Sequence, residues 1–313
     1  MRVVLSVSRE AAAIWRGLFE AALPRACIEV REPAKPVDRD AAQADYVAIH
    51  GPCETIFAEQ RKPKALFALS AGIGHLLALP NLPRDVPLIR LEDAGMAEQM
   101  ARYVQAAALR FTLRLDTYAR QQGKARWEQQ EMRGPSSLTA GVMGLGAIGG
   151  QVARALAALG FRVRGHAQSG KSIHGVDVFA GGERLDAFLD GVDFLVSVLP
   201  ATAATKGILN RESMSRLADG AHVVNIGRGA ALVDDDLVAL IRSGKLSGAT
   251  LDVFREEPLP RDHPFWGCSR IAVTPHVSGL TVPGAAVMQI AGKIVKLERG
   301  EPVSGVVAFA KGY

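Results

Sequence analysis

Short apolar runs recur along the chain and alternate with segments of helical periodicity. In the first third of the chain, these runs predict strands at residues 3–7, 46–49, 66–69 and 87–90. Later runs predict strands at residues 138–143, 161–163, 194–199, 222–226, 248–253 and 271–274. Such apolar runs are typical of parallel strands that helices cover on both faces. The alternation therefore predicts an α/β fold.

Three longer segments have the spacing of amphipathic helices, at residues 96–117, 234–243 and 283–298. The last of these could return to cover the first domain, which would make that domain discontinuous. Between the helices, the polar segment 120–137 contains Trp127. We interpret this segment either as a solvated loop or as an arm that covers a neighbouring subunit.

A glycine-rich turn of the form GxGxxG follows the predicted strand at 138–143 and leads into a helical segment. A glycine-rich turn alone is weak evidence, but after a strand and before a helix it is typical of dinucleotide binding. The first glycine permits the tight turn, the second lets a pyrophosphate approach, and the third allows close packing of helix on strand. The N–H groups at the start of the helix would face the phosphates. The predicted cofactor contacts in this turn are Gly144, Leu145, Gly146, Ala147, Ile148 and Gly149.

The segment 164–171, at the end of the second predicted strand, has no acidic residue. Sites for NAD usually place Asp or Glu there to bind the 2′-hydroxyl group of the ribose. A carboxylate would repel a 2′-phosphate, whereas Ser169 and Lys171 could bind one. We therefore predict NADP as the cofactor, with Gln168, Ser169 and Lys171 as contacts. The alternative interpretation is a solvated basic loop.

Composition and charge narrow the choice of ligand. The chain has 313 residues, of which 48% are hydrophobic and 22% charged, enough for two domains of ordinary size. Its net charge of +5 is dispersed along the sequence, which favours a small anionic ligand over nucleic acid. Cys27, Cys53 and Cys268 lack metal-site spacing and indicate reduced thiols in a cytoplasmic protein without a metal. No segment has the apolar length needed to cross a membrane.

Charged residues follow three successive strands in the second half, with Arg228, Glu257 and His276 the most informative. Each alone could be a surface charge or a structural side chain. Together they fit hydride transfer to a 2-keto acid. Arg can orient the carboxylate and polarise the carbonyl group, and His can protonate the developing alkoxide. A carboxylate would orient the imidazole, and we prefer Glu257 to Glu256 because Pro258 stiffens its backbone.

The chain resembles the D-2-hydroxyacid dehydrogenases, and within them the bacterial glyoxylate/hydroxypyruvate reductases. The similarity runs through residues 90–96, 144–149, 197–200, 227–229, 251–258, 274–277 and 311–313. It implies two Rossmann-like domains, each a doubly wound parallel sheet. A dinucleotide-binding domain at 98–279 would be inserted in a discontinuous, flavodoxin-like substrate-binding domain at 1–97 and 280–313. It also implies a symmetric homodimer formed through the cofactor domains.

The resemblance assigns roles to further residues. Arg228, Glu257 and His276 match the family's catalytic residues, and Arg228 and His276 would also contact the substrate. Asp252 would contact the nicotinamide carboxamide. The loop 70–74 would hold the substrate carboxylate, with contacts from Ala71, Gly72 and Ile73. Further cofactor contacts are expected at Leu199, Pro200, Thr205 and Ile226.

Three positions on the substrate side, His50, Gly74 and His75, depart from the family pattern, and they leave the preferred keto acid open. The leading hypothesis is NADPH-dependent reduction of glyoxylate or hydroxypyruvate. The alternative from another class is a dinucleotide-sensing interaction protein with little turnover. A methyltransferase would not need the residues at the three strand ends.

Overall fold

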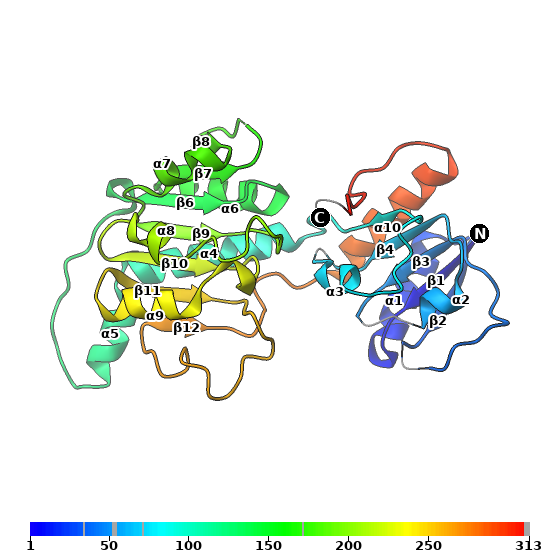
Figure 1. Cartoon of the computed structure of the whole chain (residues 1–313), viewed down its shortest axis with the longest axis horizontal. Coiled ribbons are helices and arrows are strands. Elements are labelled where there is room, and N and C mark those ends of the chain that lie inside the picture. The colour runs from blue at the N-terminus through cyan, green and yellow to red at the C-terminus, as the bar shows by residue number, and fades with distance from the viewer. Residues whose placement is uncertain (34, 52–54, 71, 171, 310–313) are drawn as a thin grey trace. The chain divides into compact units, whose positions relative to one another are not determined.

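The computed structural model describes residues 1–33, 35–51, 55–70, 72–170 and 172–309. The chain divides into two compact units (Figure 1). Unit 1 combines Met1–Gly95 with Thr281–Tyr313, and unit 2 is Met96–Leu280. No helix within the described ranges is long and apolar enough to cross a membrane. Cys27 and Cys268 are both free, and Cys53 lies outside the described residues.

Unit 1 contains a five-stranded sheet in which every pair of neighbouring strands is parallel. The strand order is β2-β1-β3-β4-β5. The strands are β1 (Arg2–Ser6), β2 (Cys27–Arg31), β3 (Tyr46–Ile49), β4 (Ala65–Ala68) and β5 (Leu88–Ile89). The three central strands β1, β3 and β4 are almost wholly buried, as their apolar runs predict, whereas β2 lies at the sheet edge and is mostly only partly buried.

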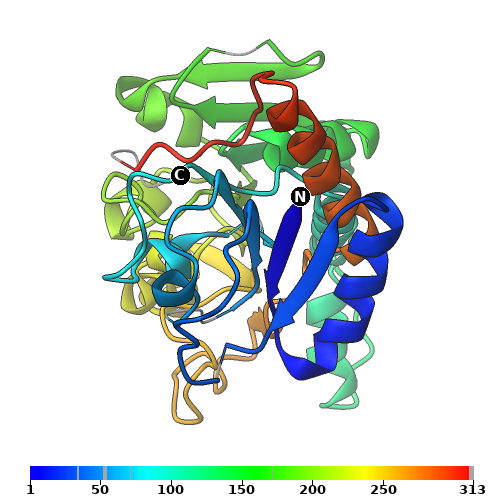
Figure 2. The same ribbon diagram turned by 90° about the vertical axis from the view of Figure 1, so that its right-hand side faces the viewer.

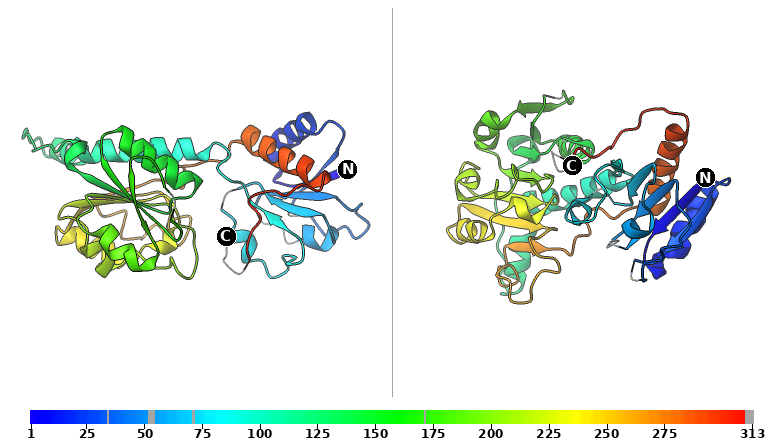
Figure 3. Two further views of the ribbon diagram at one scale, coloured as in Figure 1. Left: turned by 90° about the horizontal axis from the view of Figure 1, so that it is seen from above. Right: turned by 45° about the vertical axis from the view of Figure 1, so that its right-hand side comes forward.

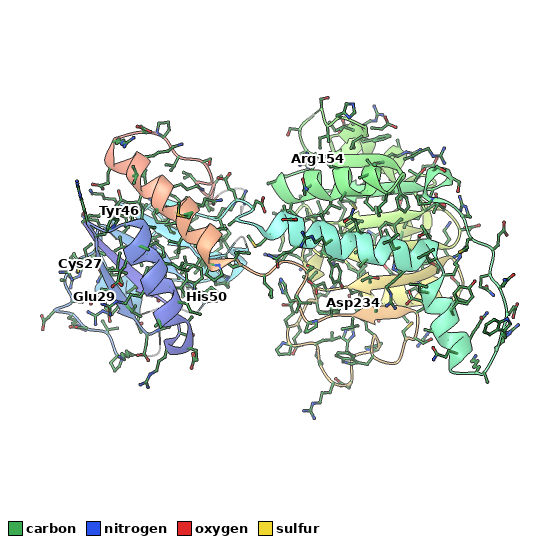
Figure 4. The ribbon with its side chains drawn as sticks, turned by 180° about the vertical axis from the view of Figure 1, so that it is seen from behind. Cys27, Glu29, Tyr46, His50, Arg154 and Asp234 are labelled. Carbon is green, nitrogen blue, oxygen red and sulfur yellow. The ribbon has the colours of Figure 1, made fainter. Side chains whose placement is uncertain are left out.

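Two long helices, α1 (Arg9–Ala22) and α10 (Pro283–Glu298), lie side by side on one face of this sheet (Figure 2 and Figure 3). The shorter helices of unit 1 are α2 (Ile56–Glu59) and α3 (Gly74–Leu77). In unit 1, the hydroxyl group of the buried Tyr46 on β3 donates a 2.7 Å hydrogen bond to the exposed Glu298 at the end of α10 (Tyr46 is labelled in Figure 4). The C-terminal helix therefore does return to the first domain.

Unit 2 contains a seven-stranded parallel sheet in the order β12-β11-β10-β9-β6-β7-β8. Its strands are β6 (Thr139–Met143), β7 (Arg162–Ala167), β8 (Val176–Ala180), β9 (Phe194–Ser197), β10 (Ala221–Asn225), β11 (Leu246–Leu251) and β12 (Ile271–Val273). From β6 the chain first builds towards the β8 edge and then returns through β9 to the β12 edge. The strand order reverses between β6 and β9, which is where open α/β sheets bind their ligands.

Helices cover both faces of the second sheet (Figure 3). One face packs on α4 (Met96–Thr112) and α6 (Ala147–Ala158), and the other on α7 (Leu185–Leu189), α8 (Arg211–Ser215) and α9 (Asp234–Arg242). The remaining elements are α5 (Leu115–Gln122) and the 3-10 turns η1 (Pro135–Ser137), η2 (Gly182–Arg184) and η3 (Gly229–Ala231). Two separate hydrophobic clusters result, one on each face.

Two predictions about local structure in unit 2 are wrong. The single helix expected at 96–117 ends at Thr112, because Arg114 takes a left-handed conformation (φ 56°) and α5 starts a new helix that extends into the predicted loop 120–137. The strand expected at 161–163 continues to Ala167, so the first half of the segment 164–171 is strand and not loop. β8 was missed because its residues are only partly buried and Asp177 interrupts its short apolar run.

His222 on β10 is a buried titratable group within the second sheet. Its ring stacks on Phe194 with centroids 5.9 Å apart, and its Nε2 atom lies 3.0 Å from the hydroxyl group of Thr250. Burial lowers the pKa of His222 to about 4. The folded protein therefore holds this imidazole in its neutral form.

This burial predicts a pH dependence of stability. An unfolded histidine titrates near pH 6.5, so between about pH 6.5 and 4 the unfolded chain binds the additional proton. The free energy of unfolding should fall as the pH drops through this window, by about 3 kcal/mol in total. Urea unfolding at pH 7.0 and 5.0 should show this loss in the parent and a smaller loss in His222→Gln. The exposed His174→Gln is the matched control and should behave like the parent; equal losses in all three proteins would contradict the assignment.

Candidate active site

The parallel register of unit 2 places the three charged clusters at one edge of its sheet. Asn225, the last residue of β10, pairs with Leu251, the last residue of β11, which in turn pairs with Val273, the last residue of β12. Arg228 and His276 each lie three residues beyond the end of their strand. Arg228 and His276 therefore follow strand ends that lie close together in the sheet.

His276 and Glu257 form a hydrogen-bonded pair. The Nδ1 atom of His276 lies 2.7 Å from Oε2 of Glu257, and Oε1 of the same carboxylate accepts a 2.9 Å hydrogen bond from the backbone N–H of Phe254. The carboxylate is thus held at both oxygen atoms. Glu257, and not the fallback Glu256, contacts the imidazole. Within the described part of the chain, Nε2 of His276 has no hydrogen-bond partner, so this atom is left available to a ligand.

Arg228 lies in a tight loop between β10 and η3. Its Nη1 atom donates a 2.6 Å hydrogen bond to the carbonyl of Gly227, and Asn225 donates to the carbonyl of Arg228 itself. A Cβ atom at Gly229 would lie 1.9 Å from the backbone carbon of Phe254, so only glycine lets this loop approach the segment that carries Glu257. Burial lowers the pKa of Arg228, an effect that the charge of Glu257 opposes. Arginine remains a cation under such conditions.

Asp252 is fully buried directly after β11 and holds the loop that carries His276. Its Oδ1 atom accepts hydrogen bonds from the hydroxyl group of Thr274 (2.6 Å) and the N–H of Val277 (2.9 Å). Its Oδ2 atom accepts from the N–H of Ser278 (2.9 Å), and its carbonyl accepts from the N–H of His276 (3.0 Å). In this structure the carboxylate of Asp252 accepts hydrogen bonds from the loop that carries His276, and its contact with nicotinamide stays a prediction.

The glycine-rich turn has the close packing that its sequence predicts. A Cβ atom at Gly149 would lie 1.8 Å from the carbonyl oxygen of Gly144, so the helix could not start so near the strand with any other residue there. Gly146 and Ala147 are exposed at the start of α6, with open space around Gly146. Unpaired N–H groups at such a helix start can bind an anion. Leu145 is buried against the backbone at Gly165, so only its main chain could reach a ligand.

The predicted residues for the 2′-phosphate lie just beyond β7. Gln168 and Ser169 follow Ala167 directly and are exposed. Lys171 lies outside the described residues. Within the described residues, no hydrogen bond or ion pair to another side chain ties down Gln168 or Ser169, which leaves both open to a ligand.

The other predicted ligand contacts differ in exposure. Leu199 and Ile226 are buried in the two cores, with 8% and 2% of their surfaces exposed, whereas Pro200 is exposed. Thr205 uses its hydroxyl group to hold the loop, donating a 2.6 Å hydrogen bond to the carbonyl of Pro200.

Gly72 and Ile73 belong to unit 1, where Ser70 donates a 2.8 Å hydrogen bond to the carbonyl of Gly72. Ala71 lies outside the described residues. Across the ranges that the structure describes, no group of His, Cys, Asp and Glu side chains is arranged to hold a metal ion.

One contact near the site was not predicted from the sequence. The hydroxyl group of Tyr103, on α4, lies 2.6 Å from that of Thr274. Along the sequence, Tyr103 fits the apolar periodicity of a helix, which gives no signal of a polar partner 171 residues away. Only the fold brings the two side chains together.

Comparison with known proteins agrees with this geometry. Residues 105–278 match the sequence model of the NAD binding domain of D-isomer specific 2-hydroxyacid dehydrogenases. The chain is 42% identical over 304 residues to the glyoxylate/hydroxypyruvate reductase A of Serratia proteamaculans (strain 568), with 96% of each chain covered. It is 41% identical over 307 residues to the reductase of the same name from Salmonella newport (strain SL254), again with 96% of each covered.

Solved structures are also similar over the whole chain, and two of them bear on the cofactor. The first is a D-isomer specific 2-hydroxyacid dehydrogenase from Xanthobacter autotrophicus Py2 in complex with NADPH and MES, with a TM-score of 0.93, 34% identity and coverage of 100% of this chain and 99% of that one. The second is an NADPH-dependent glyoxylate/hydroxypyruvate reductase from Sinorhizobium meliloti in complex with NADP and sulfate, with a TM-score of 0.91, 31% identity and the same coverage.

These similarities confirm the predicted fold class of two Rossmann-like α/β domains and the resemblance found in the sequence. The similarities to whole relatives and solved structures extend over both units. The chain belongs to the D-isomer specific 2-hydroxyacid dehydrogenase family and is an NAD(P)-dependent dehydrogenase.

Proposed function

We propose that this protein reduces small 2-keto acids, glyoxylate or hydroxypyruvate, to 2-hydroxy acids with NADPH. The observation that carries the proposal is the arrangement of Arg228 beside the hydrogen-bonded pair of His276 and Glu257. Reductases that act on these two keto acids are 41–42% identical to the chain, which supports the substrate class. Similar structures contain NADPH or NADP, which supports the cofactor.

In this proposal each unit has a distinct role. Unit 2 is the dinucleotide-binding domain, with the turn 144–149 at the pyrophosphate and Gln168, Ser169 and Lys171 at the 2′-phosphate. Unit 1 is the substrate-binding domain, through the backbone of Ala71, Gly72 and Ile73. The residues present fit the dinucleotide, because the start of α6 is open and no carboxylate lies between Glu131 and Asp177 to repel a 2′-phosphate.

The charged residues divide the chemistry between them. Bound NADPH supplies the hydride to the C2 carbon of the keto acid. Arg228 binds the substrate carboxylate through its planar guanidinium group and polarises the C2 carbonyl. His276 donates the proton from Nε2 to the developing alkoxide, while Glu257 keeps the ring oriented through Nδ1 and stabilises the imidazolium.

The chain is also proposed to act as a symmetric homodimer in the cytoplasm. The observation that favours the dimer is the polar segment after α5, in which Trp127 is fully exposed and Met132 is 60% exposed. A fully exposed tryptophan on a loop of this length is unusual unless a partner covers it. The alternative, a catalytically weak, dinucleotide-sensing protein, would need only the turn at 144–149, so the presence of the three charged residues argues against it.

The function and its cofactor are tested together by assaying a panel of small 2-keto acids with NADPH and with NADH. We expect turnover of glyoxylate or hydroxypyruvate and a higher kcat/KM with NADPH. Lys171→Ala should raise the KM for NADPH at least about tenfold, because a charge-assisted contact with the 2′-phosphate is lost, and leave the KM for NADH nearly unchanged. Binding of NADPH without turnover of any keto acid would favour the sensing protein, and a preference for NADH would refute the assignment of residues 168–171.

Substrate orientation is tested by Arg228→Lys, which keeps the charge and loses the planar fork. We expect kcat/KM for the keto acid to fall about 100-fold while the Kd for NADPH stays within twofold. The matched control is Arg211→Lys on α8, where the guanidinium group is exposed and pairs with Asp236. If Arg228→Lys were as active as the control, Arg228 would have no place in the site.

The acid–base pair is tested by the pH dependence of Glu257→Gln in both reaction directions. Glutamine keeps the shape of the side chain but removes the charge that stabilises the imidazolium. We therefore expect the pH–rate profiles of reduction and of 2-hydroxy acid oxidation to move in the same direction, towards lower pH.

Opposite effects on the two directions at a fixed pH distinguish this result from general damage, which would depress both rates without moving either limb. Glu256→Gln is the control, since Glu257 and not Glu256 contacts the imidazole. Unchanged profiles in Glu257→Gln would remove Glu257 from the acid–base pair.

A further inference from the structure

The loop that carries His276 is connected to helix α4 by a chain of two hydroxyl groups. The hydroxyl groups of Tyr103 and Thr274 lie 2.6 Å apart, and Thr274 donates a 2.6 Å hydrogen bond to Oδ1 of Asp252. Thr274 has one hydroxyl proton, and Asp252 receives it. Tyr103 must therefore be the donor to Thr274. The hydrogen bonds thus run from Tyr103 to Thr274 and from Thr274 to Asp252.

Asp252, the last group in this series of hydrogen bonds, holds the backbone of His276 and of the two residues that follow it. Asp252 accepts the N–H groups of Val277 and Ser278 through its carboxylate, and its carbonyl accepts the N–H of His276. The backbone of His276 has a φ of 55°, a left-handed conformation that is uncommon for residues with a side chain, and the hydrogen bonds to Asp252 hold it there. The direction of the imidazole therefore depends on these hydrogen bonds.

The surroundings of Tyr103 keep its phenol protonated and in place. Burial raises the pKa of Tyr103 and the charge of Asp252 acts in the same direction, whereas the charge of Arg110 opposes them. Neighbouring residues on α4 contact the same segment. Gln99 donates a 2.9 Å hydrogen bond to the carbonyl of Leu280, and Met100 packs against Gly279. One face of α4 is thus the platform on which the segment 274–280 rests.

We propose that Tyr103 is a positioning residue for proton transfer, which acts through Thr274 and Asp252 to hold His276 against Glu257. The proposal rests on the proposed reductase function, because it makes Tyr103 responsible for the orientation of His276 during proton transfer to the substrate. The hydroxyl group of Tyr103 forms its hydrogen bond with Thr274, not with the imidazole of His276 or the carboxylate of Glu257. Small displacements of an acid–base group cost one to two orders of magnitude in rate, so a fixed loop is worth much to the reaction.

The test is Tyr103→Phe, which removes the hydroxyl group and keeps the ring. We expect kcat to fall about tenfold, with the KM for the keto acid and the Kd for NADPH within twofold of the parent values. Because a looser loop weakens the contact between His276 and Glu257, the alkaline limb of reduction should also move to lower pH. Thr274→Val should have the same two effects, and Thr274→Ser, which keeps the hydroxyl group, should restore both.

A double variant shows whether Tyr103 acts through its hydrogen bond to Thr274 or through a general effect on packing. If Tyr103 acts only through the hydroxyl group of Thr274, adding Tyr103→Phe to Thr274→Val should cause no further loss of kcat. The matched control is Tyr46→Phe in unit 1, where a buried hydroxyl group donates a 2.7 Å hydrogen bond to Glu298. This control should lose stability to a similar extent and keep the kcat and pH profile of the parent.

The outcomes distinguish the two proposals. If the parent protein turns over none of the keto acids, the proposed function fails. If the parent is active and Tyr103→Phe matches it in kcat and pH profile, the role of Tyr103 is refuted. Independent, multiplicative losses in the double variant would refute the relay through Thr274. Should Tyr103→Phe not fold, Thr274→Val and Thr274→Ser decide the question by the same two measurements.

Discussion

The parallel register of β10, β11 and β12 aligns the last residues of three strands at one edge of a sheet. Parallel strands need crossover connections, and so residues far apart along the chain leave the sheet side by side. Arg228, Asp252 and His276 depend on this alignment for their proximity, because no local contact in the sequence would bring them together. Close backbone approaches at Gly229 complete the arrangement, since they place the arginine loop against the segment that ends in Glu257.

Much of this could be predicted from the sequence, for identifiable reasons. Central strands such as β3 and β4 are buried on both faces and leave unbroken apolar runs, and the turn at 144–149 requires glycine at Gly149 where the helix meets the strand. Glu257 was preferred to Glu256 as the partner of His276, and the structure has this contact at 2.7 Å. The similarity to known dehydrogenases covers nearly the whole chain, so the family was accessible from the sequence as well.

The rest depends on tertiary contacts that leave no periodic signal. Strands β2 and β8 lie at sheet edges, where partial burial weakens the apolar pattern. The break between α4 and α5 occurs at Arg114, whose left-handed backbone no residue preference announces, because arginine favours helices. In the sequence, Tyr103 fits the apolar periodicity of α4 and gives no sign of a polar contact. Its hydrogen-bond partner, Thr274, lies 171 residues further along the chain.

The contacts between α4 and the segment 274–280 also bear on how the chain folds. Unit 2 lies, along the sequence, between the two pieces of unit 1, which must meet for α10 to pack on α1 and for Ile89 to pair with Val306. The hydrogen bond from Gln99 to Leu280 brings the two ends of unit 2 together. Once unit 2 has folded, the connection between the pieces of unit 1 is shortened from a whole domain to a few residues, and the entropic cost of closing it falls accordingly. This topology therefore favours folding of the inserted domain first, with the interrupted domain completed around its adjacent ends.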